Sequence, residues 1–451
     1  MKTQFSLVIL LVLFVSGCIA HTPSINTTTP EDFPTPNFTR TISPTETTIL
    51  TETAVLSATA AASTTAIPTI EIGPPNTPDP SAIFPDITEI HMTSETSGWA
   101  FASSGDNVLV LHTSDGGTTW RDVTPPFESW SALIGQNEFY FPRLGEGFFL
   151  DERRAWISTL RVDKEWPQDV FSAFTAKIML STDDGGATWQ MSKLPPGGMG
   201  VGYGRFIDFI NPMHGWFAVY GHPGAGAGYQ GIYMTRDGGD SWEIVFDNLG
   251  TPSGSYDCCD LAFGDSTTGL MTISRLGWYS PLYIRWTQDG GTTWQFQDLP
   301  EPEDPSISDP SISDFDCGTV FPHAFSKLEV ALIVECRMLR DAGSPANEWI
   351  YGNFLYSTQD GGMNWESFPA PSGRLHLLNQ SSGWMLGEEI HWTDDGGKTW
   401  TNINDVTWEG QFNFIDAHHG WAVARNDDEI ALVKTENGGR SWIIIVPRLV
   451  P

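Results

Sequence analysis

The stretch TSDGGTTW at residues 113–120 decides the fold, because close variants of it occur six more times along the chain. The other copies are TDDGGATW (182–189), TRDGGDSW (235–242), TQDGGTTW (287–294), TQDGGMNW (358–365), TDDGGKTW (393–400) and TENGGRSW (435–442). Successive motif tryptophans are 35 to 71 residues apart, with a mean of about 54, which is close to the length of one four-stranded propeller blade. Repetition at this period predicts an array of similar units.

Each copy has the chemistry of a tight hairpin turn. In the first copy, the Asp115 carboxylate can accept backbone N–H groups further along the turn, and the two glycines can adopt positive φ. The tryptophan then buries a large ring between sheets. The alternative is calcium binding or catalysis, but one acid per turn supplies too few oxygen ligands for calcium. We therefore interpret as structural the pairs Asp115 and Trp120, Asp184 and Trp189, Asp237 and Trp242, Asp289 and Trp294, Asp360 and Trp365, Asp395 and Trp400, and Asn437 and Trp442.

Strand-like runs precede the motifs. An apolar run leads directly into each copy, as in VLVLH (108–112), and most copies have a small residue followed by Trp further upstream, as in GWAFA (98–102) and GWFAV (215–219). A third run lies before these, for example FIDFI (206–210). With the strand that the motif Trp begins, each unit has four strands. We predict an all-β, seven-bladed β-propeller of four-stranded antiparallel blades over residues 86–451.

The chain before the repeats divides into two segments. Residues 1–17 contain the apolar run FSLVILLVLFV (5–15), which is shorter than the roughly 20 residues that a membrane-spanning helix needs and is typical of a signal peptide. The run ends in VSGC, which resembles a bacterial lipobox and would make Cys18 a lipidated residue; the alternative is ordinary cleavage near Ala20. Residues 18–85 are rich in Thr, Ser and Pro, which predicts a disordered linker. We expect a lipid-anchored protein on the outer face of the bacterial cytoplasmic membrane or the cell surface.

The charge of the chain excludes one class of partner. The chain has 23 Lys and Arg against 55 Asp and Glu, a formal net charge of −32. This excess of negative charge argues against nucleic acid and anionic lipid surfaces as main partners. We expect no nucleic-acid partner and a membrane contact through the lipid anchor only.

The motif Ser/Thr-x-Asp-x-Gly-x-x-Trp resembles the Asp-box, or bacterial neuraminidase repeat. Because most copies have an upstream Gly-Trp strand, residues 86–451 look most like the photosystem II assembly and stability factors. That family belongs to a wider propeller superfamily that includes sialidases, sortilin-type receptors and xyloglucanases. The resemblance implies a propeller that docks to a membrane or envelope complex without catalysis and without a cofactor.

Loop lengths predict which face binds the partner. In an antiparallel meander, the loops joining second to third strands lie opposite the motif turns, and four adjacent units have long ones: 161–176, 221–231, 274–281 and 340–353. Their aromatic residues are the candidates for contact with a protein or a glycan: Trp166, Phe171, Tyr229, Trp278, Tyr279, Trp349 and Tyr351. The alternative is that these side chains only pack the loops onto the rim of the propeller.

A carbohydrate-active propeller, either glycan-binding or a sialidase-like exo-glycosidase, is the alternative function. A sialidase needs an arginine cluster, and Arg143, Arg205 and Arg374 lie at or just before first strands, where they could point into the central channel. The Phe/Tyr-Arg-Ile-Pro signature of sialidases does not occur in the chain. We therefore predict no catalytic residues.

Four cysteines lie in the repeat region: Cys258, Cys259, Cys317 and Cys336. An even number in an exported domain suggests two disulfides with three possible connectivities. Pairing Cys317 with Cys336 would join neighbouring strands of the fifth unit and leave a vicinal bond, whereas the other pairings bridge the fourth and fifth units. Because no His lies at finger-like spacing from these cysteines, we predict no metal site.

Overall fold

The computed structural model of this 451-residue chain describes residues 84–105, 107–126, 143–160, 176–195, 203–220, 230–247, 260–272, 282–302, 312–340, 348–426 and 429–450. The chain divides into two compact units, Met1–Pro75 and Asn76–Pro451, and all described residues belong to the second unit. Within them there is no helix of the length and apolarity that crossing a membrane requires.

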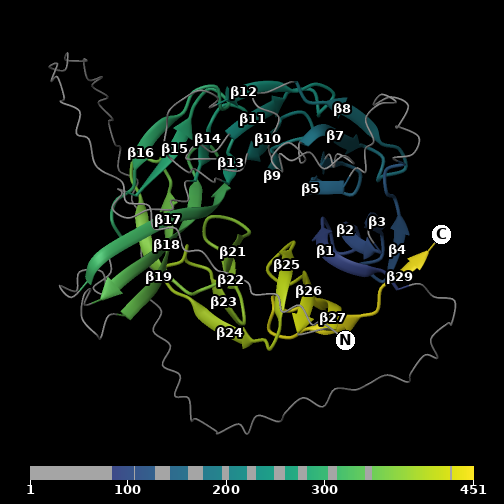
Figure 1. The fold of residues 1–451 in the computed structure, drawn as a ribbon. Helices are drawn as coiled ribbons and strands as arrows, with labels where there is room; N and C mark the ends of the chain where they lie inside the picture. Colours follow the sequence, from purple (N-terminus) through teal and green to yellow (C-terminus); the bar gives the residue numbers. More distant parts are fainter. Residues whose placement is uncertain are drawn as a thin grey trace, which may run out of the picture. The chain divides into compact units, whose positions relative to one another are not determined.

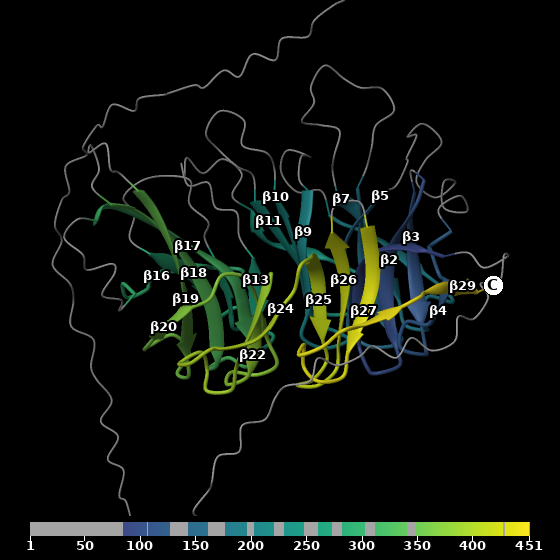
Figure 2. The same cartoon turned by 90° about the horizontal axis from the view of Figure 1, so that it is seen from below.

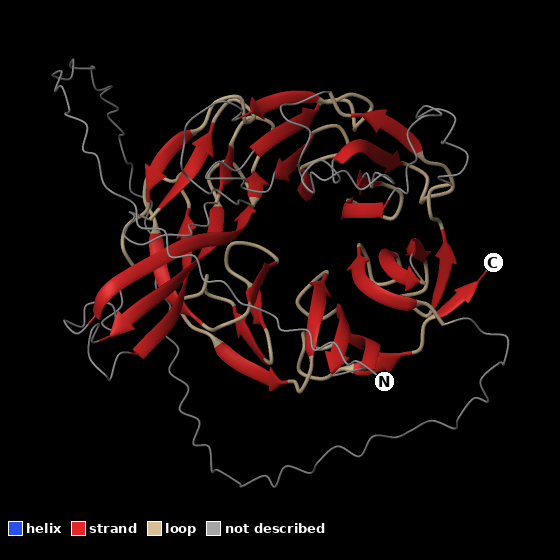
Figure 3. Ribbon diagram, in the orientation of Figure 1, coloured by secondary structure: helices blue, strands red, loops and turns tan. Residues whose placement is uncertain are grey.

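The described strands form seven sheets, numbered here as blades 1 to 7 in chain order, each with four consecutive antiparallel strands. Figure 1 shows these sheets arranged in a ring, and Figure 3 shows strands and loops but no helix among the described residues. The strands of blades 1 to 3 are β1 (Asp86–Met92), β2 (Gly98–Ser104), β3 (Asn107–Thr113), β4 (Thr119–Asp122), β5 (Arg143–Phe149), β6 (Ala155–Leu160), β7 (Ala176–Thr182), β8 (Gln190–Lys193), β9 (Tyr203–Phe209), β10 (Gly215–Tyr220), β11 (Gln230–Thr235) and β12 (Glu243–Asp247).

The remaining blades follow the same order. Their strands are β13 (Leu261–Phe263), β14 (Gly269–Met271), β15 (Tyr283–Thr287), β16 (Gln295–Asp298), β17 (Ile312–Ala324), β18 (Val330–Arg340), β19 (Glu348–Thr358), β20 (Glu366–Ala370), β21 (Arg374–Leu377), β22 (Gly383–Leu386), β23 (Glu389–Thr393), β24 (Thr401–Asp405), β25 (Glu409–Phe414), β26 (Gly420–Asn426), β27 (Glu429–Thr435) and β28 (Ile443–Ile445). A last strand, β29 (Arg448–Val450), joins blade 1 as a fifth strand. The predicted all-β seven-bladed propeller is confirmed.

The motif turns join the third and fourth strands of each blade through one recurring hydrogen-bond pattern. In blade 1, the Thr113 hydroxyl donates to Asp115 Oδ1 over 3.0 Å and accepts the Gly117 N–H. Asp115 accepts the Thr119 N–H over 2.8 Å and the Thr119 hydroxyl over 2.6 Å. Both glycines have positive φ in all seven copies. In the seventh copy, Asn437 takes the place of the aspartate and still accepts the Ser441 N–H.

A second turn, not predicted from the sequence, joins the first and second strands of each blade. Its first side chain accepts backbone N–H groups two and three residues further on, as Ser94 does from Thr96 and Ser97. The equivalent residues are Asp151, Asn211, Asp265, Ser326, Asn379 and Asp416. In every blade the first motif glycine donates its N–H to a carbonyl in this turn, as Gly116 does to Thr96 over 2.8 Å. The two turns therefore lie on the same face of the propeller.

The hydrophobic core lies between neighbouring blades, because each sheet buries both faces. Tryptophans of the second strands stack on the last aromatic residue of the next blade's first strand: the ring centroids of Trp156 and Phe209 are 3.6 Å apart, as are those of Trp216 and Phe263. Trp384 stacks on Phe414 at 4.0 Å in the same way. Such stacked pairs add to the stabilisation from buried area and hold neighbouring blades in register.

The ring closes between blade 7 and blade 1. The Trp421 indole N–H donates to the Gly116 carbonyl over 3.0 Å, and the Gln411 side chain bonds both the N–H and the carbonyl of Ile90. Beyond β28 the chain continues into β29, which pairs in parallel with β4. Since β4 is the last antiparallel strand of blade 1, β29 becomes the fifth and outermost strand of that sheet. Closure therefore combines a buried seam with one C-terminal strand.

Candidate functional site

The predicted partner-binding residues fall into two groups. Trp349 and Tyr351 lie on β19, and so are strand residues and not the loop residues that the sequence suggested. The other candidates, Trp166, Phe171, Tyr229, Trp278 and Tyr279, lie outside the described residues, as do Cys18, Cys258 and Cys259.

Blade 5 is longer than every other blade among the described residues. Its strands β17, β18 and β19 have 13, 11 and 11 residues, whereas the strands of the other blades have 3 to 7. Figure 2 shows these strands extending past the neighbouring sheets on one side of the ring. Cys317 and Cys336 are register partners on β17 and β18 and form a disulfide. The extension is therefore held by a covalent link as well as by backbone hydrogen bonds.

The two faces of this extension differ in how far their side chains are exposed. Cys336 and Met338 on β18 are buried, whereas Trp349 is 37% exposed and Tyr351 is 73% exposed. Trp349 and Tyr351 are two residues apart, so their side chains point to the same face of the sheet. The Arg337 guanidinium lies over the Trp349 ring, 4.7 Å from its centroid, and Arg337 is the register partner of Tyr351. We call the three residues Arg337, Trp349 and Tyr351 the blade 5 aromatic edge.

A second polar feature lines the inner strands of the ring. In three blades the residue before the last one of the first strand bonds to the next blade. Asp208 Oδ2 accepts the Phe263 N–H over 3.4 Å, and Asn413 Oδ1 accepts the Met92 N–H over 2.7 Å. A His376 ring nitrogen lies 3.0 Å from the Phe414 carbonyl. The complete set of equivalent residues is His91, Phe148, Asp208, Ala262, His323, His376 and Asn413.

Burial shifts the pKa of three members of this row. Desolvation raises the pKa of Asp208 to about 6, although backbone N–H groups of Phe263 and Phe209 oppose the shift. Desolvation also lowers the pKa of His323. For His376, desolvation together with the charges of His323 and Arg374 lowers the pKa to about 4. At neutral pH the two histidines are therefore uncharged, and Asp208 carries the row's negative charge.

These shifts predict opposite effects on stability, and His376 gives the first. Its folded-state pKa of about 4 lies below the ordinary value of 6.5, so the folded state resists protonation and loses stability as the pH falls from 6.5 toward 4. We expect His376→Gln, which can still donate to the Phe414 carbonyl, to be about 2 kcal/mol more stable than wild type at pH 4.5. The two proteins should be equally stable at pH 7.5. Urea unfolding at both pH values measures this, and equal stability at pH 4.5 would contradict it.

Asp208 gives the second effect. Because its folded-state pKa of about 6 lies above the ordinary 3.8, the stability that its proton provides below pH 4 is lost as the pH rises through 6. We expect Asp208→Asn to be about 2 kcal/mol more stable than wild type at pH 7 and equally stable at pH 3.5. Glu335 is exposed, so the control variant Glu335→Gln should leave the free energy of unfolding unchanged at both pH 7 and pH 3.5. A variant that is less stable than wild type at pH 7 would show that the carboxylate charge is needed for folding.

Arg374, one of the three arginines considered for a substrate carboxylate, begins β21. Its guanidinium lies 5.6 Å from the centroid of the Phe321 ring. Arg143 and Arg205 lie on β5 and β9, but their side chains are outside the described part. An arginine cluster is thus not assembled from the side chains that the structure describes.

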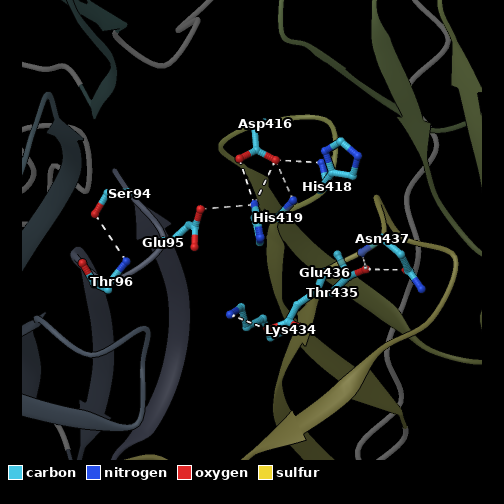
Figure 4. A network of polar contacts seen from close by, with 10 residues as sticks. All are labelled: Ser94, Glu95, Thr96, Asp416, His418, His419, Lys434, Thr435, Glu436 and Asn437. Carbon is cyan, nitrogen blue, oxygen red and sulfur yellow. Dashed lines mark hydrogen bonds and ion pairs between the residues drawn. The ribbon is translucent and has the colours of Figure 1, made fainter.

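One group of potential metal ligands occurs among the described residues. Glu95, Asp416 and His419 meet where blades 1 and 7 adjoin, with ligand atoms within 4.8 Å of one another (Figure 4). His419 Nδ1 is 2.9 Å from Asp416 Oδ2 and 3.7 Å from Glu95 Oε1. Although burial opposes it, hydrogen bonds from His419 and from the His418 N–H lower the pKa of Asp416 to about 2. Since Asp416 occupies the repeated first-turn position, we interpret the group as turn structure.

The comparisons with known proteins give one distant relative by sequence. No protein-family model matches the chain. The chain is 26% identical over 235 residues to vacuolar protein sorting/targeting protein 10 of Lodderomyces elongisporus. The matched region covers 44% of this chain and 15% of that protein's length. The chain is thus a distant relative of that sorting protein and corresponds to a small part of it.

The solved structures found are only weakly similar to this chain, and they carry no argument about it. An ulvan lyase, a polysaccharide lyase, matches at 12% identity and a TM-score of 0.44. The match covers 68% of this chain and 85% of the lyase chain. A puromycin-hydrolyzing peptidase of Mycobacterium tuberculosis matches at 10% identity and a TM-score of 0.47. The match covers 80% of this chain and 53% of the peptidase chain.

Proposed function

We propose that this protein is a binding module that presents the blade 5 aromatic edge to a macromolecular partner and performs no catalysis. The observation that carries the proposal is the exposure of Trp349 and Tyr351 on a disulfide-linked extension of the ring. Large aromatic side chains with few rotatable bonds provide much contact area at a small cost in conformational entropy. Tryptophan, tyrosine and arginine are also the residues most often found at binding hot spots.

The partner that we propose is a protein or a membrane-protein complex. The distant relative is named for protein sorting and targeting, and the resemblance to photosystem II assembly factors points to docking on a membrane complex during its assembly or maintenance. In our proposal, a lipid on Cys18 holds the protein at the outer face of a bacterial membrane.

The proposal that the protein is not an enzyme rests on its sequence. The sialidase signature does not occur, and the one described arginine of the predicted cluster stacks on Phe321. Glycoside hydrolysis needs two carboxyl groups at a set separation. A panel of fluorogenic glycosides, including a sialoside, should give no turnover, and turnover that Arg374→Ala abolishes would replace the binding proposal with a hydrolase.

Crosslinking tests the binding proposal. The tagged full-length protein is crosslinked in native membranes, purified, and analysed by mass spectrometry and by sugar composition. We expect a defined protein or complex to be enriched over a control lipoprotein. Enrichment of envelope polysaccharide alone would favour the glycan-binding alternative, and enrichment of neither would contradict a binding role.

A further inference from the structure

A cavity of about 360 Å³ opens between the first strands of three consecutive blades. Segments of β9, β13 and the end of β17 form its walls, so it lies at the inner edges of blades 3, 4 and 5. Its volume is within the range of pockets that hold small molecules. Arg337, Trp349 and Tyr351 of the blade 5 aromatic edge are not among its described lining residues.

The lining combines aromatic rings with polar groups. Phe206, Phe209, Phe263 and Phe325 contribute to the walls, and Asp208 and His323 are the titratable residues among the described lining. Phe209 and Phe263 are held by their stacking on Trp156 and Trp216. These two rings are therefore held in place before any ligand arrives.

The Asp208 carboxylate has no cationic partner among the described side chains. It accepts a long hydrogen bond, 3.4 Å from the Phe263 N–H, and the Phe209 N–H also acts on it, but both donors are neutral backbone groups. The described ion pairs do not include it. A half-buried carboxylate without a cation is unfavourable beside aromatic rings. A ligand that brought a positive charge would remove this cost.

The backbone beside His323 is distorted toward the cavity. β17 loses register with β18 between Val320 and His323, and within this bulge Phe321 has a φ of +51°. Positive φ is uncommon outside glycine, and strained residues of this kind concentrate at functional sites. The bulge places Pro322 and His323 in the cavity wall.

The imidazole of His323 adds a second acceptor. Its Nδ1 lies 3.0 Å from the Phe321 carbonyl, so the tautomer that donates this hydrogen bond leaves Nε2 with a free lone pair. The cavity thus offers a carboxylate, an imidazole nitrogen and aromatic rings. Ring faces attract cations, whereas a metal such as calcium needs six to eight oxygen ligands.

We propose that this cavity binds the ammonium group of a small organic amine, with Asp208 as the counter-ion, His323 as a hydrogen-bond acceptor and the phenylalanine rings around the apolar part of the ligand. This site is separate from the blade 5 aromatic edge, and the proposal does not depend on the macromolecular partner. Its ligand class is a primary amine with an apolar body.

Calorimetric titration of the full chain with benzylamine, and with its neutral analogue benzyl alcohol, tests the proposal. We expect benzylamine to bind at least tenfold more tightly than benzyl alcohol. Asp208→Asn should weaken benzylamine binding at least tenfold and leave benzyl alcohol unchanged. The matched control Glu335→Gln removes an exposed carboxylate on β18 and should change neither affinity.

Three outcomes would overturn the proposal: no detectable benzylamine binding, equal affinity for amine and alcohol, or an Asp208→Asn variant that binds the amine as well as wild type does. Because Asp208→Asn is expected to be more stable than wild type at neutral pH, misfolding should not obscure the result. Should that variant fail to fold, titrating folded wild type with benzylamine and benzyl alcohol still decides between the outcomes.

Discussion

Trp421→Ala is expected to lower the free energy of unfolding by about 3–5 kcal/mol, the range for truncating a buried aromatic residue. Trp421 is fully buried and packs in the seam between blades 7 and 1 with Ile90 and Leu111. Its indole N–H also donates to the Gly116 carbonyl over 3.0 Å. The substitution therefore creates a cavity and leaves a buried carbonyl without its partner, and both effects destabilise the folded state.

The position of this seam makes the loss larger than at an exposed tryptophan. Successive blades are joined by the chain itself, whereas blades 7 and 1 are joined by side-chain contacts and the β29–β4 pair. Chemical denaturation of Trp421→Ala beside Trp349→Ala measures the difference. Trp349 is 37% exposed, so its replacement should cost less than about 1 kcal/mol. Equal losses from the two variants would contradict the assignment of Trp421 to a closing seam.

The double variant Trp349→Ala with Tyr351→Ala is expected to weaken partner binding about 100-fold, because together the two aromatic side chains contribute roughly 3 kcal/mol to binding. Both side chains are exposed, so the fold and the thermal midpoint should change little. The dissociation constant for the captured partner measures the effect. An affinity within a factor of three of wild type would remove the blade 5 aromatic edge from the interface.

Phe296→Ala is the matched control for that experiment. Phe296 lies on β16, the outer strand of blade 4, and is 63% exposed. The Arg285 guanidinium lies 4.8 Å from its ring centroid, nearly the same arrangement as Arg337 over Trp349. Loss of binding in this variant would mean that any exposed aromatic matters, and the blade 5 edge would have no special role.

The fold could be predicted because its determinants are local. Each motif copy specifies its own turn through a carboxylate or amide oxygen, a hydroxyl and two glycines within a few residues, as at Thr113, Asp115 and Gly117. Seven local signals at a blade-length period leave few architectures to consider. The first turn of each blade escaped prediction because Ser94, Asp151 and Asn211 share a hydrogen-bonding role and not a residue type.

The candidate sites depend on contacts that are distant in sequence. The extra length of β17 to β19 has no repeat signal, so Trp349 and Tyr351 were expected in a loop and lie on a strand. The cavity unites Asp208, Phe263 and His323 from three successive blades, and only the packing of these blades side by side brings them together. The parallel pairing of β29 with β4 joins Leu449 to Trp120, a separation that no local pattern could indicate.

The central claim is that the protein acts by binding a partner at the blade 5 aromatic edge. The most direct test compares crosslinked capture from native membranes by the wild-type protein, the Trp349→Ala, Tyr351→Ala double variant and Phe296→Ala, with quantitative mass spectrometry of the captured material. The account predicts one defined partner with wild type and Phe296→Ala, and its loss with the double variant. Equal recovery of that partner by all three proteins would contradict the claim.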